Sequence, residues 1–189
     1  TIRQNGEQVV SQPPVLLSEV GVKRATVLVL DQSGSMVDHG GLTTAVTKMK
    51  EIIEAAPPGD QFGLVTFGSS AVVAQNMTTD RTLIVKALDD IKPDPKARTA
   101  LWDGVASAAA ILRTVPDADH SIILVTDGKD DSSKVTAAQA RGDVIGGGPG
   151  QGATVFAMGI TQEKQLDKDG LSKLVGAAGG RFFVTGKAT

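Results

Sequence analysis

The sequence contains no cysteine, and this absence removes three kinds of chemistry together. Disulfides, thiolate metal sites and cysteine nucleophiles are all excluded. The absence leaves the compartment open, because cytosolic and exported domains can both lack cysteine. The first residues show neither the charged and apolar segments of a leader peptide nor a membrane span, so no membrane segment is expected in this chain.

Aromatic residues are scarce, and neither sign of charge is in large excess. The chain has no tyrosine and a single tryptophan, Trp102, and its 19 Lys and Arg residues nearly balance its 21 Asp and Glu residues. Nucleic-acid binding is therefore not expected, because it needs a basic excess for the phosphates or aromatic rings for base stacking. With 189 residues, 41% of them hydrophobic, the chain suits one compact domain with an aliphatic core.

The N-terminal residues differ from the rest of the chain. Residues 1–23 are polar and irregular, and Pro13 and Pro14 interrupt them. Because prolines disrupt a central strand, this segment is interpreted as an N-terminal extension or an added edge strand. Residues 24–189 are then predicted to form one domain.

From residue 25 onwards, apolar strands alternate with amphipathic helices. Residues 25–30 form a continuous apolar run, typical of a parallel strand buried on both faces. The segments that follow are expected to be helices at 42–56, 80–91, from about 99, 135–145 and 165–178, and strands at 61–67, 71–75, 121–125, 153–160 and 181–184. The short link at 68–70 makes the second and third strands an antiparallel hairpin. The pattern predicts an α/β fold with an open, mostly parallel twisted sheet of about six strands, one antiparallel edge, and helices on both faces, similar to a Rossmann fold.

Two acid-bearing turns follow buried strands of this predicted sheet. Asp31, Ser33 and Ser35 come directly after the first strand, and Asp127 comes after the strand at 121–125. In open α/β sheets, ligands bind at the carboxyl edge where the strand order reverses, so Asp31 and Asp127 approach one another if their strands are neighbours. A cation relieves the repulsion of two converging carboxylates. Ligands that are all hard oxygens suit Mg²⁺ or Mn²⁺ rather than zinc or copper.

Three motifs together carry a family resemblance. The sequence Asp-Gln-Ser-Gly-Ser-Met at 31–36, Arg-Thr-Ala-Leu-Trp-Asp-Gly at 98–104 and Thr-Asp-Gly at 126–128 resemble, in order, the three elements of the metal-ion-dependent adhesion site of von Willebrand factor A domains. The first motif alone is a weak signal, but all three on an alternating strand and helix pattern are specific. The resemblance covers roughly residues 24–186.

The resemblance implies a ligand set and a function. Ser33, Ser35 and Thr99 would supply hydroxyl ligands, and Asp31 and Asp127 would act directly or through water, around Mg²⁺, with Mn²⁺ or Ca²⁺ as alternatives. The last position would be left for a carboxylate of a protein partner. The resemblance thus implies a non-enzymatic adhesion or complex-assembly module. Simpler interpretations are that Asp31 only caps a turn and that Thr99 only caps a helix.

Enzymatic alternatives fit the residues less well. Asp31 after the first strand resembles the nucleophile of haloacid-dehalogenase-like phosphatases, which would make the chain a Mg²⁺-dependent phosphohydrolase. That family needs a second aspartate two residues later as the general acid, and Ser33 stands there instead. The Gly-x-Ser-x-Gly motif of a serine hydrolase and the Gly-x-Gly-x-x-Gly motif of a dinucleotide-binding domain are both absent.

Several charged residues near the motifs have open interpretations. Arg98 departs from the family pattern, in which a small residue is common, and its charge lies either beside the predicted metal site or outward. Asp103 either orients a ligand hydroxyl or favours the helix dipole. Asp130 and Asp131 are expected on a solvated loop. The Arg-Gly-Asp sequence at 141–143 is interpreted as a chance match.

Overall fold

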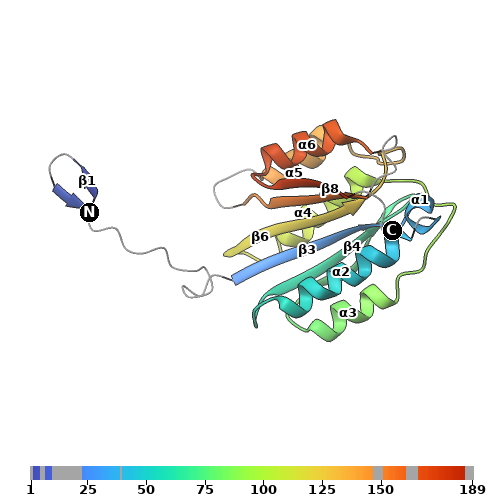
Figure 1. Cartoon of the computed structure of the whole chain (residues 1–189), viewed down its shortest axis with the longest axis horizontal. Coiled ribbons are helices and arrows are strands. Elements are labelled where there is room, and N and C mark those ends of the chain that lie inside the picture. The colour runs from blue at the N-terminus through green and yellow to red at the C-terminus, as the bar shows by residue number, and fades with distance from the viewer. Residues whose placement is uncertain are drawn as a thin grey trace.

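A six-stranded sheet forms the centre of the computed structural model, which describes residues 2–4, 7–9, 23–38, 40–146, 151–160 and 166–185. The strand order is β5-β4-β3-β6-β7-β8, and every neighbouring pair is parallel except β4 and β5 (Figure 1). The strands are β3 (Lys23–Asp31), β4 (Gln61–Phe67), β5 (Ala71–Thr78), β6 (Ala118–Thr126), β7 (Thr154–Ile160) and β8 (Arg181–Thr185). The predicted fold class is confirmed, including the single antiparallel edge.

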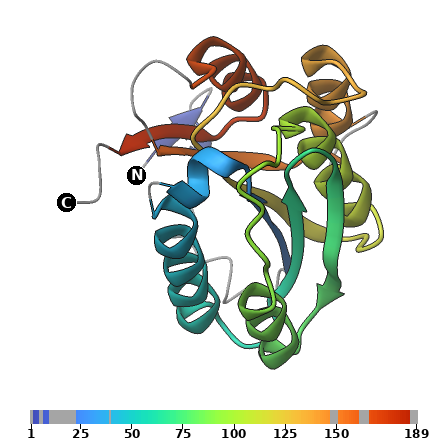
Figure 2. The ribbon, with the colours of Figure 1, turned by 90° about the vertical axis from the view of Figure 1, so that its right-hand side faces the viewer.

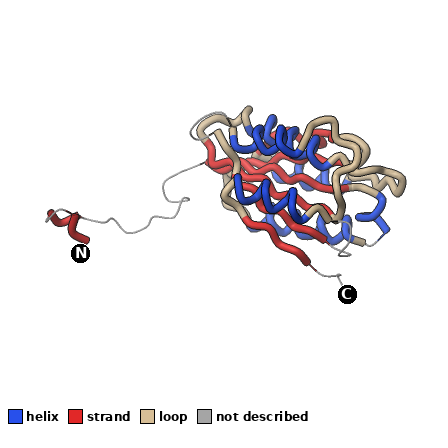
Figure 3. The backbone as a smooth tube through the Cα atoms, turned by 90° about the horizontal axis from the view of Figure 1, so that it is seen from above, coloured by secondary structure: helices blue, strands red, loops and turns tan. Residues whose placement is uncertain are grey.

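Helices cover both faces of this sheet, as the layered view in Figure 3 shows. One face carries α2 (Gly41–Ala55) and α3 (Arg81–Asp89), and the other carries α4 (Leu101–Leu112), α5 (Ala137–Ile145) and α6 (Lys168–Ala177). Side chains of a strand alternate between faces, so β3 contributes Leu28 and Leu30 to the core under α2, and Val27 and Val29 to the core under α4. Both cores are aliphatic, as the composition predicts.

The N-terminal residues form a separate small element. Strands β1 (Ile2–Gln4) and β2 (Glu7–Val9) pair with each other in an antiparallel hairpin. Within the described part of the chain, neither strand pairs with the six-stranded sheet. Residues 10–22, with the two prolines, lie outside the described residues, so the division at residue 23 stays a prediction.

The start of α4 differs from the expected position for a physical reason. The sequence predicts a helix from about Thr99, whereas α4 begins at Leu101. The Ala100 N–H donates to the Gly68 carbonyl at 2.7 Å, and the Thr99 carbonyl accepts from the Asp131 N–H at 2.9 Å. These contacts with other loops hold residues 99 and 100 outside the helix.

The central position of β3 places the reversal of strand order at the carboxyl end of this strand. The chain passes from β3 to β4 on one side and later returns to β6 on the other, so the strand order reverses at β3. Strands β3 and β6 pair directly, with Leu30 opposite Val125, which confirms the predicted neighbours. Figure 2 views this edge, where the short α1 (Gly34–Asp38) follows β3. Among the described helices, none is long and apolar enough to cross a membrane.

Candidate functional site

The Asp31 carboxylate is fixed by the ends of two strands. The side chain is fully buried at the last residue of β3. One of its oxygens, Oδ1, accepts from the Ser33 N–H at 2.8 Å, and Oδ2 accepts from the Thr126 hydroxyl at 2.5 Å. Thr126 is the last residue of β6 and also accepts from the Gly128 N–H at 3.2 Å. The carboxylate therefore links the turn after β3 to the turn after β6.

The predicted serines connect Asp31 to Asp127. The Ser33 and Ser35 hydroxyl oxygens lie 3.3 Å apart, and the Ser35 hydroxyl donates to Asp127 Oδ1 at 2.8 Å. Ser33 and Asp127 are buried, and Ser35 is half-buried. Four of the five predicted site residues thus form one continuous hydrogen-bonded cluster at the carboxyl edge.

Thr99, the fifth predicted residue, lies beside this cluster. Its hydroxyl oxygen would be 3.5 Å from a Cβ atom placed on Gly128, so Thr99 contacts the residue after Asp127. The helix cap of α4 is Ala100, and no side chain caps it. The interpretation of Thr99 as a simple helix cap is therefore wrong, and its side chain lies beside Gly128, the residue after Asp127.

Three aspartates connect the loop after β6 to Thr99 and the start of α4. Asp131 accepts from the Thr99 N–H at 2.9 Å, and Asp130 accepts from the Ser133 hydroxyl. From α4, Asp103 accepts from the N–H groups of Lys134 and Val135 at 2.9 and 3.0 Å. Asp130 and Asp131 lie on a loop, as expected, and Asp131 is exposed; the hydrogen bonds of their side chains also connect this loop to the start of α4.

The departure at Arg98 also has a local explanation. The Arg98 guanidinium donates to the Asp131 carbonyl and forms an ion pair with the Asp131 carboxylate, with Nε 3.4 Å from Oδ2. Its side chain is 61% exposed, so the ion pair contributes little to stability. Arg98 therefore binds the loop after β6, and the Asp131 carboxylate neutralises its charge.

The structural roles of two motif residues, Thr126 and Gly34, could not be predicted from the motifs alone. Thr126 lies within the third motif, but only the pairing of β3 with β6 brings its hydroxyl to Asp31. Gly34 lies within the first motif, and its φ angle is not positive, so a left-handed backbone conformation does not explain the glycine. Its small size matters instead, because a Cβ there would lie 2.2 Å from the Pro95 carbonyl oxygen. The segment before Arg98 therefore packs directly against the serine turn, and the Gly34 N–H donates to the Ala97 carbonyl at 3.2 Å.

The electrostatics of the cluster favour a bound cation. The pKa of Asp31 is raised from its ordinary 3.8 to about 6: burial is the main cause, the negative charge of Asp127 adds to it, and hydrogen bonds from Ser33 and Thr126 partly oppose it. No described lysine or arginine forms an ion pair with Asp31. The described residues contain no group of three or more His, Cys, Asp or Glu side chains suited to a metal. A cation here would thus need the hydroxyl groups as well as the two carboxylates.

Comparisons with known proteins identify the family. The model of the von Willebrand factor type A domain matches residues 26–129, more than half of the chain, and the chain belongs to this family. Its relatives include a "UPF0353 protein" from Nocardia farcinica, which is 33% identical over an alignment of 129 residues that covers 61% of this chain and 38% of the relative. A second "UPF0353 protein", from Mycolicibacterium paratuberculosis, is 32% identical over 101 residues, 51% of this chain and 30% of the relative.

Solved structures show the same fold. The "von Willebrand factor type A from Catenulispora acidiphila" is 26% identical with a TM-score of 0.75, over 87% of this chain and 39% of that one. The proximal thread matrix protein 1 from the mussel byssus, "with zinc occupied MIDAS motif", is 21% identical with a TM-score of 0.70, over 88% of this chain and 44% of that one. The chain thus spans less than half the length of these relatives.

The packing of Gly34 predicts a large difference between two glycine substitutions. Gly34→Ala places a methyl group against the Pro95 carbonyl and should destabilise the domain by roughly 1–3 kcal/mol, because the backbone must move. Gly142→Ala in α5 meets no atom within 4 Å and should stabilise the domain by up to about 1 kcal/mol. Chemical denaturation measures both, and equal stability of the two variants would contradict the packing role of Gly34.

The raised pKa of Asp31 predicts how stability depends on pH without metal. A carboxyl group whose pKa rises on folding destabilises the folded chain once it ionises, so this cost appears as pH rises from 3.8 to about 6. The metal-free Asp31→Asn variant should therefore be more stable than wild type above about pH 6, by roughly 1–3 kcal/mol, and the advantage should vanish near pH 4. Denaturation in chelator across this pH range tests it. A difference that does not change with pH would refute the buried-charge explanation.

Proposed function

We propose that this domain is a divalent-metal-dependent protein-binding module that holds Mg²⁺ with Asp31, Ser33, Ser35, Thr99 and Asp127 and binds an acidic group of a partner. One observation carries the proposal. The side chains of Asp31, Ser33, Ser35 and Asp127 form one hydrogen-bonded cluster at the reversal point of the sheet. Ligands bind at this position in open α/β sheets.

The donor set suits a hard cation. Two carboxylates balance the double positive charge of Mg²⁺, and the hydroxyl groups are neutral hard oxygens. A cation beside Asp31 would also offset the charge that burial disfavours. The mussel byssus protein carries zinc in its motif. In this chain the oxygen-only donors favour Mg²⁺ or Mn²⁺, with Ca²⁺ as a further candidate.

The hydrogen bonds already present would tune these ligands. The Ser35 hydroxyl donates a hydrogen bond to Asp127, which makes the hydroxyl oxygen richer in electron density for a cation. The Thr126 hydroxyl and the Ser33 N–H orient the two oxygens of Asp31. We infer that Thr126 is a positioning residue that fixes the carboxylate before the metal arrives.

The proposed role is binding without turnover. When bound, the cation would act as an acceptor for a partner carboxylate, because such a group can complete its coordination. The hydroxyl groups of Ser33 and Ser35 contact carboxylates and each other. His120 lies in β6 and its Nε2 contacts the Val115 carbonyl at 2.8 Å, so this imidazole is not placed to activate either serine. Adhesion and complex assembly are both compatible with this mode of binding.

A metal titration tests the proposal directly. Chelator-treated protein should bind Mg²⁺ and Mn²⁺ with one-to-one stoichiometry in calorimetry, and Ser33→Ala should weaken the affinity on the order of tenfold or more, because a direct ligand is lost. The fluorescence of Trp102, two residues into α4, should change in parallel.

The matched control is Thr47→Ala in α2. The Thr47 hydroxyl only donates to the Thr43 carbonyl on an exposed helix surface, so its loss should leave metal affinity unchanged. The absence of a saturable heat for both cations in wild type would overturn the proposed metal site. An equal affinity in Ser33→Ala and Thr47→Ala would remove Ser33 from the ligand set.

A further inference from the structure

One side of the proposed metal site carries lysines without carboxylate partners. Lys92 and Lys96 lie in the segment between α3 and Thr99 that packs against Gly34, and both are exposed. Among the described residues, no carboxylate lies within ion-pair distance of either ammonium group. Their positive charges are therefore open to a ligand at the carboxyl edge.

The acidic residues of the same segment are already engaged. Asp89 pairs with Lys50 at 2.5 Å, and Asp90 pairs with Lys86 at 2.9 Å. Asp94 accepts from the backbone N–H of Lys96 at 2.9 Å. Each acid near the two lysines thus has another partner, and the segment presents an excess of positive charge.

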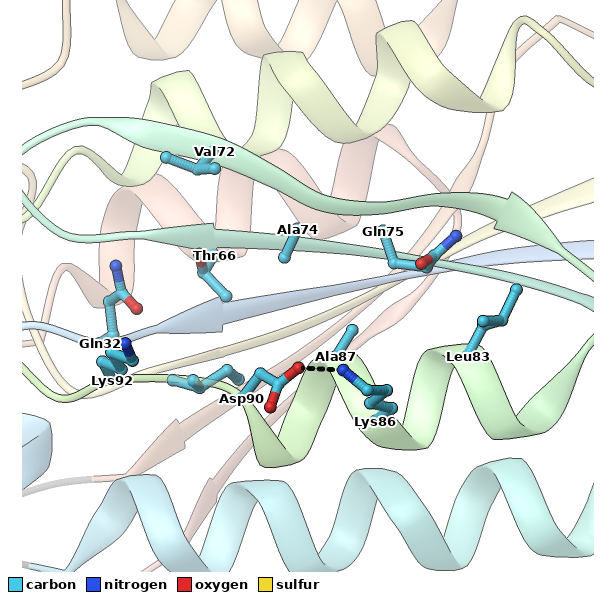
Figure 4. Close-up of a pocket in the computed structure, with 11 residues that line it drawn as sticks. Gln32, Thr66, Val72, Ala74, Gln75, Leu83, Lys86, Ala87, Asp90 and Lys92 are labelled. Carbon is cyan, nitrogen blue, oxygen red and sulfur yellow. Dashed lines mark hydrogen bonds and ion pairs between the residues drawn. The ribbon is translucent and has the colours of Figure 1, made fainter.

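A groove begins beside Lys92 and runs between α3 and the β4–β5 hairpin (Figure 4), and Lys96 lies four residues further along the same segment. The volume of the groove is about 500 Å³. Gln32, the residue after Asp31, lines the same pocket as Lys92, so the groove is continuous with the edge that carries the proposed metal site. The Gln32 N–H donates to the Phe67 carbonyl at 2.8 Å, which fixes this end of the groove.

The walls of the groove also contain aliphatic side chains that are exposed to solvent. Val72 on β5 is 52% exposed and Leu83 on α3 is 45% exposed, and Ala87 and Ile91 lie beside them. Strand β5 is the edge of the sheet, and none of its residues is charged. Exposed aliphatic side chains in a groove favour an apolar group of a ligand.

The geometry points to an extended acidic peptide segment of a partner protein as the occupant of this groove. This inference rests on the proposed function, because one carboxylate of the peptide binds the metal. The chain then passes Gln32, a second carboxylate contacts Lys92 and Lys96, and an aliphatic side chain lies between Val72 and Leu83. Lys92 and Lys96 are thus specificity-determining residues that select a partner with at least two acidic groups.

Charge complementarity distinguishes this occupant from a neutral one. A neutral extended segment would fill the apolar walls but leave both lysines without a counterion. An acidic segment pairs with them and is also attracted over a distance, which raises the association rate at low salt. The expected binding is therefore sensitive to ionic strength, since exposed ion pairs are screened.

Three synthetic peptides test the inference by fluorescence polarisation in saturating Mg²⁺. The first has two aspartates followed by a leucine, the second has the aspartate nearer the leucine changed to asparagine, and the third has the leucine changed to glycine. Wild type should bind the first peptide most tightly, by about three- to tenfold over the second. The third should also bind more weakly, because the groove loses its apolar contact.

A double variant and a matched control separate the lysines from general charge. Lys92→Gln with Lys96→Gln should lower the affinity for the first peptide about three- to tenfold and remove its advantage over the second. Lys173→Gln on α6 changes the net charge on the opposite face of the sheet and should change the affinity little. Metal affinity measured by calorimetry should be the same in wild type and both variants.

The outcomes distinguish this inference from the proposed function. Equal binding of the first and second peptides, or an unchanged affinity in the double lysine variant, would overturn the inference while a normal Mg²⁺ titration keeps the metal site. Peptide binding that persists in chelator would overturn the link between the groove and the metal. Loss of the Mg²⁺ signal itself in wild type would overturn both.

Discussion

The buried carboxylate of Asp31 is the constraint on which the carboxyl edge depends. A carboxylate in an aliphatic environment must be hydrogen-bonded or neutralised, because desolvation of an isolated charge is costly. Its two oxygens are engaged by the Ser33 N–H and the Thr126 hydroxyl, from the ends of β3 and β6. These hydrogen bonds hold the turn after β3 against the turn after β6. The charge that remains is the reason a cation at this position would be stabilising.

The loops around the cluster are held by aspartates that bind backbone N–H groups. Asp131 holds Thr99, and Asp103 holds the loop after β6. Such bonds satisfy backbone donors that would otherwise be exposed at the end of the sheet. The aspartates near the cluster therefore divide into two groups: Asp31 and Asp127 point into it, and the others fix the frame around it. A count of acids in the sequence does not separate these groups.

The sequence predicts most of the fold because local patterns and chain order suffice for it. The apolar run before Asp31 and the short link after Phe67 indicate a buried parallel strand and an antiparallel edge, and both predictions are confirmed. Contacts between residues far apart in the chain could not be predicted. The close approach of Gly34 to Pro95, the bond from Thr126 to Asp31, and the start of α4 at Leu101 all depend on how separate loops meet.

The site and the groove beside it differ in what they can specify. A cation held by Asp31 and Asp127, as proposed, would bind any carboxylate, so the proposed site would offer affinity but little choice between partners. Selectivity between partners must therefore come from side chains that do not bind the cation. Lys92 and the wall formed by Val72 lie where a ligand chain would continue past Gln32. If the proposed function holds, the segment between α3 and α4 is therefore the part of this domain in which a change of sequence would redirect binding without loss of the proposed metal site.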